Sequence, residues 1–198
     1  MMGYTVIGNV KSRALRVLWT LEELGLAYEH IDAPPGSEQV TRINPAGKVP
    51  VLVADGVPIT DSVAIMTFLA DRHGGLTFPA GTIERARQDS LTHMILDEID
   101  AILWTAARHS FILPEELRVA AIKDSLKWEF ARSQTALAAR MAEDGPFLMG
   151  QTMTIADILL AHCGGWAIAA KFPITEPRLR DHIAMMRDRP AFHRALGA

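Results

Sequence analysis

The sequence contains a single cysteine, Cys163, among its 198 residues. One thiol excludes an internal disulfide framework and a Cys-x-x-Cys redox motif, and it suits a reducing compartment. The chain also lacks an apolar run long enough to cross a membrane. Strand-like residues begin at Tyr4, without the charged region and apolar core of a signal peptide. From these absences we expect a soluble, cytoplasmic protein with no membrane partner.

Basic patches and metal-ligand spacings are missing as well. The chain has 20 Lys and Arg against 23 Asp and Glu, and it is mildly acidic on both sides of Gly74. No Lys/Arg cluster is interleaved with aromatic residues, so we expect no nucleic-acid partner. The seven His residues show no His-x-x-x-His or comparable spacing, so we expect no metal site.

Strand and helix patterns alternate in the part of the chain before Gly74. Apolar residues recur with strand or helix periodicity, and Asp55-Gly56 joins two short apolar runs as a hairpin turn. The order is β-α-β-α-β-β-α. The expected strands are 4–7, 27–31, 51–54 and 57–60, and the expected helices are 14–24, 38–43 and 62–72.

Only helical patterns follow the linker marked by Pro79 and Gly81. Gly164-Gly165 lies in a segment that is apolar nearly all round, which indicates a buried helix against which another helix packs closely. The expected helices are a long one through 91–106 that ends before Pro114, then 115–143, 154–170, 177–187 and 190–196. The sequence therefore predicts a small α/β domain, 1–74, and an all-helical domain, 82–198.

Two neighbouring motifs indicate a binding site for a peptide-like ligand. Asn44-Pro45-Ala46-Gly47-Lys48-Val49-Pro50 precedes an apolar strand, and an X-Pro bond in such a turn can be held in the cis form. This would leave the backbone of Val49 open to an added strand. Asp61-Ser62 then opens a helix, whose free N–H groups and dipole attract a carboxylate. Alone, each motif is more often an ordinary turn or helix cap, but the two together, in this order, favour the binding site.

These segments resemble the cytosolic glutathione S-transferases, over the full length of the chain. Ser12-Arg13-Ala14 through Tyr28-Glu29 is similar to the first helix of bacterial and theta-like members. Thr154-Ile155-Ala156-Asp157 resembles the capping box of the family's buried helix. The resemblance implies a thioredoxin-like N-terminal domain that binds glutathione, and an all-α C-terminal domain that shapes a pocket for a hydrophobic electrophile. It also implies a homodimer.

The resemblance assigns a part of glutathione to each residue of the two motifs. Val49, before Pro50, would pair its backbone with the cysteinyl part. Asp61 would pair with the γ-glutamyl ammonium, and the Ser62 hydroxyl and N–H with its α-carboxylate. Lys48 either reaches the glycine carboxylate or is a solvated turn residue. In the helical domain, Trp104 and His109 lie on the helix that lines the second pocket in this family, although core and surface roles suit them too.

The residue that stabilises the glutathione thiolate lies in the loop 9–13. We favour the hydroxyl of Ser12, with Asn9 as the second choice and Arg13 as a cationic contributor. Alternatively, Ser12 only caps the helix, and Lys11, Arg13 and Arg16 form a solvated helix face. Tyr4 lies too early for a tyrosine-type site, and the loop has no cysteine for mixed-disulfide chemistry.

The first functional hypothesis is an enzyme that activates glutathione and adds its sulfur to an electrophilic small molecule. Conjugation, peroxide reduction and isomerisation all use the same thiolate, and the sequence does not separate them. The alternatives are a non-catalytic interaction module on the same fold and a carrier that binds glutathione without turnover. Because Val49-Pro50 and Asp61-Ser62 are present, the enzyme is favoured over a pure scaffold.

Overall fold

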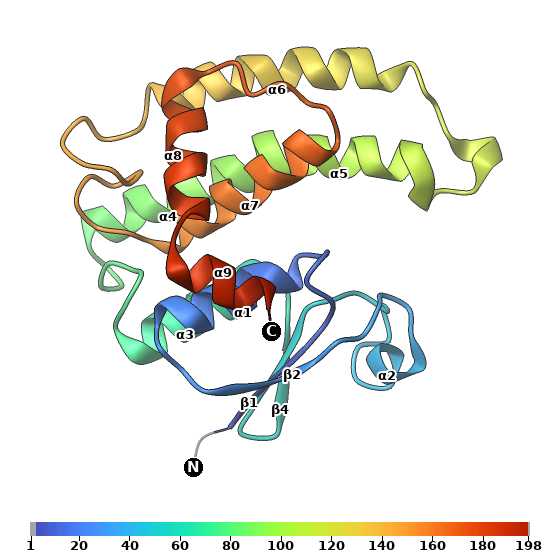
Figure 1. Cartoon of the computed structure of the whole chain (residues 1–198), viewed down its shortest axis with the longest axis vertical. Helices are drawn as coiled ribbons and strands as arrows, with labels where there is room; N and C mark the ends of the chain where they lie inside the picture. The colour runs from blue at the N-terminus through green and yellow to red at the C-terminus, as the bar shows by residue number, and fades with distance from the viewer. Residues whose placement is uncertain (1–2, 198) are drawn as a thin grey trace. The chain divides into compact units, whose positions relative to one another are not determined.

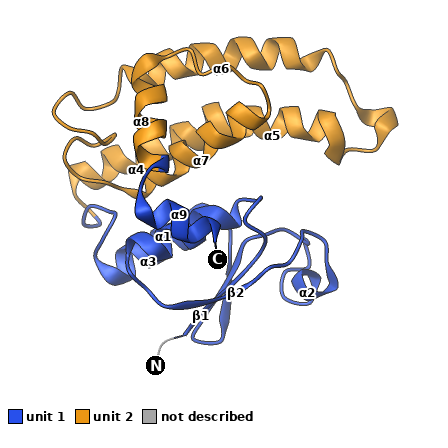
Figure 2. Cartoon of the chain, in the orientation of Figure 1, with its two compact units in different colours: residues 1–80, 187–198 blue, residues 81–186 orange. Residues whose placement is uncertain are grey.

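The computed structural model describes residues 3–197, which form two compact units (Figures 1 and 2). Unit 1 extends to Ala80 and includes the chain from Arg187 onward, whereas unit 2 comprises Gly81–Met186. The last helix thus groups with unit 1, although it follows the helical region in sequence. The division into domains 1–74 and 82–198 stays a prediction about parts that fold independently.

Unit 1 has the mixed four-stranded sheet of a thioredoxin-like fold, with strand order β2-β1-β3-β4. β1 pairs parallel with β2 and antiparallel with β3, which forms the hairpin with β4. The positive φ angles of Asp55 and Gly56, 52° and 79°, suit a tight two-residue turn. The elements are β1 (Tyr4–Ile7), α1 (Ala14–Glu23), β2 (Tyr28–Ile31), α2 (Glu38–Thr41), β3 (Val51–Ala54), β4 (Val57–Thr60), α3 (Ser62–His73) and α9 (Pro190–Leu196).

The two faces of this sheet carry different helices. Ile7 and Val51 are opposite each other in the ladder and pack with Val40 of α2. Because side chains alternate along a strand, the neighbouring strand residues face the other side, where α1 and α3 lie together (Figure 1). Helices on both faces leave one end of the sheet, where β1 runs into α1, as the place where loops gather.

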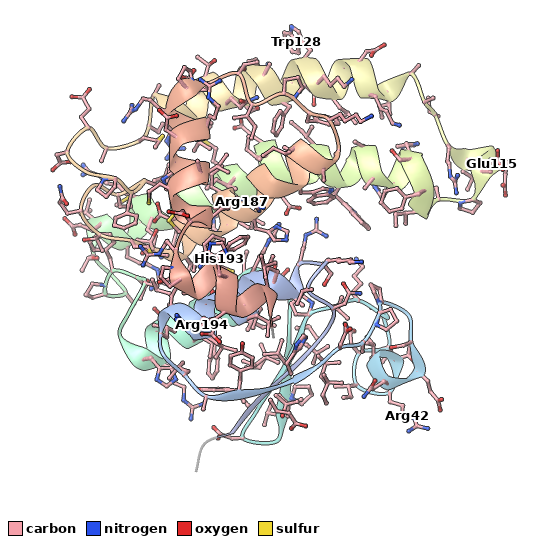
Figure 3. All side chains as sticks on the ribbon, in the orientation of Figure 1. Arg42, Glu115, Trp128, Arg187, His193 and Arg194 are labelled. Atoms are coloured by element: carbon pink, nitrogen blue, oxygen red, sulfur yellow. The ribbon has the colours of Figure 1, made fainter. Side chains whose placement is uncertain are left out.

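Helix α9 is fastened to α1 by ion pairs and by an aromatic contact. Arg189 Nε lies 2.7 Å from Glu23 Oε1, and Arg194 Nε lies 2.6 Å from Glu22 Oε2. Figure 3 shows Arg194 on α9. The rings of Trp19 and Phe192 pack at an interplanar angle of 55°, with their centroids 4.7 Å apart. These contacts explain why the C-terminal segment is part of unit 1.

Unit 2 is helical throughout, as the sequence predicts. The long helix is continuous but contains two π-helical segments, which residue periodicity does not reveal. None of the helices in residues 3–197 is both long and apolar enough to span a lipid bilayer. The elements are α4 (Ile83–Ile95), a π segment (Leu96–Asp100), α5 (Ala101–Ala107), a second π segment (Arg108–Ile112), a 3₁₀ turn (Glu115–Leu117), α6 (Ile122–Ala138), α7 (Ile155–Ala169) and α8 (Pro177–Arg187).

The expected helix over 115–143 is wrong at both ends. After the 3₁₀ turn, the N–H of Val119 donates to Nδ1 of His109 at 3.1 Å, so it makes no helical bond. Arg118 Nε donates to the carbonyl of Leu113 at 2.8 Å, which closes the turn back on itself. Val119, expected on the buried stripe, is 53% exposed. Helix α6 therefore starts only at Ile122.

Gly164 lies where α7 and α8 pack closely, as the sequence predicts. A Cβ built on Gly164 would lie 2.5–2.7 Å from three side-chain carbons of Ile183 on α8. Both residues are buried. Glycine lowers the helix propensity of α7, but a side chain at this position would prevent the close contact with α8.

We expect the Gly164→Ala variant to be less stable than the wild type by about 1–3 kcal/mol, because overpacking outweighs the gain in helix propensity. Urea unfolding followed by circular dichroism measures this. Ile183→Ala removes the obstructing carbons, so the double variant should lose less stability than the sum of the two single variants. Additive losses would show that Gly164 and Ile183 do not compete for space.

Candidate functional site

The end of β3 in unit 1 presents an unpaired stretch of backbone. The Val49–Pro50 peptide bond is cis, in agreement with the sequence-based expectation. The last ladder pairs of β3 are Ile7 with Val51 and Val51 with Thr60, so Val49 lies beyond the sheet. Among the described residues, no hydrogen bond engages the N–H or C=O of Val49. A peptide can therefore pair with this residue as a short added strand.

The turn before Val49 is held by the side chain of Asn44. Its Nδ2 donates to the carbonyl of Lys48 at 2.9 Å, and its Oδ1 accepts from the N–H of Ala46 at 3.2 Å. The carbonyl of Gly47 also accepts from the N–H of Gly36 at 2.8 Å. The exposed side chain of Lys48 projects from a turn whose backbone is thus fixed.

Asp61 caps helix α3 with one carboxylate oxygen. Its Oδ1 accepts from the N–H groups of Val63 and Ala64 at 2.9 and 3.0 Å. Its φ of 72° lies in a region that side chains other than glycine seldom adopt, and such conformations cluster at functional sites. Asp61 is exposed, and no bond within residues 3–197 uses its Oδ2. This oxygen is open to a cation.

Ser62, the first residue of α3, offers two hydrogen-bond donors. Asp61 Oδ1 accepts from the N–H groups of Val63 and Ala64, and the backbone carbonyl of Asp61 accepts from the N–H of Ile65. The N–H of Ser62 has no acceptor among the described residues, and neither has its hydroxyl proton. Two adjacent donors at a helix N-terminus match the two oxygens of a carboxylate.

Gly8 brings the loop 9–13 against Val49. A Cβ at Gly8 would lie 2.9 Å from the Cβ atoms of both Ala14 and Val49, at a φ of 143° that favours glycine. The carbonyl of Gly8 lies 2.7 Å from Nε2 of His30 on β2. A side chain at Gly8 would prevent this approach. The start of α1 and the turn before β3 therefore lie close together at one end of the sheet.

Within this loop, Ser12 and Asn9 differ in how their side chains are used. The Ser12 hydroxyl donates to the Asn9 carbonyl at 2.7 Å and accepts from the N–H of Ala14 at 3.1 Å. These bonds cap the start of α1. The half-buried side-chain amide of Asn9 makes no hydrogen bond with another described residue. Arg13, also half-buried, is the residue immediately before α1.

Tyr4 lies at the opposite end of β1 from this loop. Its hydroxyl is 2.9 Å from Nε2 of His73 at the end of α3, and the side chain is 4% exposed. This position agrees with the expectation that Tyr4 takes no part in a thiolate site.

Trp104 and His109, expected to line a second-substrate pocket, lie in unit 2. Trp104 is half-buried on α5. Nδ1 of His109 accepts from the N–H of Val119, so the proton of the neutral ring is on Nε2. Among residues 3–197, no group of three or more His, Cys, Asp or Glu side chains is placed to hold a metal ion.

The sequence interpretation missed Arg16 and understated Asn44. Arg16 was grouped with a solvated helix face, but it is 0% exposed and contacts Ser62. The sequence carried no signal for this burial, because Arg16 lies off the apolar stripe that Ala14, Val17 and Leu21 form on α1. For Asn44 the signal was the Asn-Pro pair, because an asparagine side chain bonds the backbone two residues on.

Comparison with known families gives a consistent match. A model of the glutathione S-transferase N-terminal domain matches residues 12–72. Glutathione S-transferase GstA of Escherichia coli O157:H7 is 31% identical over 163 residues, which are 79% of this chain and 76% of that protein. Other relatives align over less of their length. The chain matches 28% of glutathione S-transferase 3 of Schizosaccharomyces pombe, with 40% identity over 32% of this chain. It matches 40% of a probable elongation factor 1-gamma 2 of Arabidopsis thaliana, with 31% identity over 81% of this chain.

Solved structures match over nearly the whole chain. A glutathione transferase from Methylococcus capsulatus has a TM-score of 0.85 and 27% identity, covering 98% of this chain and 97% of that one. A theta-class glutathione S-transferase from Xanthomonas axonopodis pv. citri, solved with glutathione bound, has a TM-score of 0.76 and 25% identity. That alignment covers 100% of this chain and 99% of the other.

Proposed function

The chain belongs to the glutathione S-transferase family, and we propose that it binds glutathione in unit 1 and activates its thiol for attack on an electrophilic small molecule. The observation that carries this proposal is the pair of unused donors on Ser62, next to the open carboxylate oxygen of Asp61. The Ser62 donors suit a carboxylate, and the Asp61 oxygen suits an ammonium. The γ-glutamyl end of glutathione has both on one carbon atom.

The rest of glutathione follows from this anchor. The unpaired backbone of Val49 would hold the cysteinyl residue as a short β-addition. That backbone lies beyond the last ladder pairs of β3. Lys48 would meet the glycine carboxylate from its exposed turn. The cysteine sulfur would then lie near the loop 9–13, which Gly8 holds against Val49.

The thiolate donor in our proposal is the hydroxyl of Ser12, with Asn9 as the alternative. The Ser12 hydroxyl must leave the Asn9 carbonyl to bond a sulfur anion, whereas the Asn9 amide needs no such exchange. A donor that bonds the thiolate and not the thiol lowers the thiol pKa, and Arg13 and the N-terminus of α1 would add a favourable field.

The Ser12→Ala and Asn9→Ala variants separate these two donors. If Ser12 is the donor, Ser12→Ala should raise the pKa of bound glutathione by about 1–2 units, towards the ordinary thiol value near 8.5, and Asn9→Ala should not. The pH dependence of kcat/KM with a chromogenic aryl halide measures this pKa. The opposite pattern would assign the role to Asn9, and a Ser12→Ala variant with lower melting temperature but unchanged kcat/KM would leave Ser12 as a cap only.

The second substrate would be a hydrophobic electrophile, and we propose that Trp104 and His109 of unit 2 contact it. Trp104 offers an aromatic surface and His109 the Nε2–H of its neutral ring. A homodimer in the cytoplasm is part of the same proposal, because the family resemblance favours it. The reaction subtype stays open among conjugation, peroxide reduction and isomerisation.

A non-catalytic interaction module is the second candidate function. Its support is the match to an elongation factor 1-gamma over 81% of this chain. Glutathione turnover separates the two functions. Measurable turnover with an aryl halide or an organic hydroperoxide would reject the module. Saturable glutathione binding without turnover would favour a carrier, and no binding at millimolar glutathione would favour the module.

A further inference from the structure

Arg16 is a buried cation in direct contact with the proposed carboxylate anchor. It lies on α1 and is 0% exposed, while Ser62, at the start of α3, is 3% exposed. Arg16 Nη1 donates to Ser62 Oγ at 3.3 Å. A guanidinium keeps its proton under all ordinary conditions, so this site holds a permanent positive charge.

The contact also fixes the role of the Ser62 hydroxyl. A guanidinium has only donors, so the Ser62 oxygen must accept in this hydrogen bond. The hydroxyl proton then points away from Arg16. No described residue accepts it, and the same holds for the N–H of Ser62. Arg16 therefore leaves the hydroxyl and the N–H of Ser62 as two donors for a ligand.

We propose that Arg16 is a positioning residue that makes this anchor selective for a ligand carboxylate. The inference rests on the proposed binding of glutathione. The guanidinium orients the Ser62 hydroxyl and adds a positive charge behind it. That charge attracts the γ-glutamyl carboxylate across the serine. A ligand without this carboxylate gains nothing from Arg16.

The test compares the wild type and two Arg16 variants for their affinity to two ligands, measured by calorimetry. The ligands are glutathione and 4-aminobutanoyl-cysteinylglycine, which is glutathione without the γ-glutamyl α-carboxylate. The protein changes are Arg16→Met and Arg16→Lys. Arg42→Met is the matched control, since Arg42, the residue after α2, is exposed (Figure 3). Thermal unfolding of each variant shows whether it folds, and Arg16→Gln replaces Arg16→Met if that variant does not.

Arg16→Met should weaken glutathione binding by about tenfold to a hundredfold and binding of the decarboxylated analogue by less than about threefold. Arg16→Lys should restore part of the difference, and Arg42→Met should change neither affinity. Equal weakening of both ligands would reduce Arg16 to a structural residue and overturn the inference, while glutathione binding itself would stand. If the wild type binds no glutathione, the proposed function fails and this inference fails with it.

Discussion

The Asp157→Ala variant is expected to lose about 3–5 kcal/mol of unfolding free energy, the largest stability effect in the chain. Asp157 is 0% exposed and lies in the capping box of α7. Its Oδ1 accepts from the N–H of Leu148 at 2.8 Å, and its Oδ2 from the N–H and hydroxyl of Thr154 at 2.7 and 3.1 Å. His182 Nε2 is 3.5 Å from Oδ1. Alanine would leave the buried N–H groups of Leu148 and Thr154 without this acceptor and would remove the carboxylate beside His182.

Replacement by asparagine provides the sharper comparison. Burial raises the pKa of the Asp157 carboxyl, while His182 and the donors from Leu148 and Thr154 oppose that shift. An asparagine keeps one acceptor oxygen but points an NH₂ group at a buried donor. Asp157→Asn should therefore cost about 1–3 kcal/mol.

Denaturant unfolding measures both Asp157 variants, with Glu143→Ala as the control because Glu143 is an exposed acid of the same unit. The expected loss for Asp157→Ala corresponds to a fall in melting temperature on the order of 10 °C. Equal stability of Asp157→Ala and Glu143→Ala would mean that the carboxylate does not hold α7 and the Leu148 segment together.

Asp61→Asn is expected to weaken glutathione binding by about tenfold to a hundredfold. The reason is the loss of the charge that Oδ2 offers to the γ-glutamyl ammonium. The amide oxygen of asparagine still accepts from Val63 and Ala64, and asparagine tolerates the positive φ of this position. Asp61→Asn should therefore fold with nearly unchanged stability.

Asp61→Ala should lose the same binding contribution and about 1 kcal/mol of stability as well, because the helix cap disappears. Calorimetry with glutathione and thermal unfolding of the three proteins separate the two roles. If Asp61→Asn bound glutathione as tightly as the wild type, Asp61 would be a cap and not an ammonium partner. The exposed Asp124→Asn variant in unit 2 controls for loss of surface charge.

Local sequence signals were sufficient to predict elements whose bounds are set by neighbouring residues. The strands 51–54 and 57–60 were predicted with their final bounds because Asp55-Gly56 fixes both the turn and the register. The helices 177–187 and 190–196 start at prolines, which suit the first helical turn, and their bounds were also confirmed. The glutathione S-transferase resemblance was confirmed at the level of the family, and the thioredoxin-like fold with it.

Features that depend on distant residues were not predictable in the same way. The π segments keep the helical pattern of the sequence, so hydrophobic periodicity does not distinguish them from the α-helix around them. The false helix at 115–121 arose because the sequence does not show that His109 captures the N–H of Val119. Arg16 resembles any arginine on a helix until α3 brings Ser62 to it from 46 residues away. For Val119 and Arg16, a contact with a residue elsewhere in the chain decides the structure.

The central claim is that glutathione binds at the cis-Pro turn and the start of α3 in unit 1. Titration of ¹⁵N-labelled protein with glutathione, followed by amide NMR shifts, tests it most directly. We expect saturable shifts, largest for the amides of Val49 and Ser62, with little change at the amide of Leu148 in unit 2. Absence of shifts at millimolar glutathione, or shifts confined to unit 2, would contradict it.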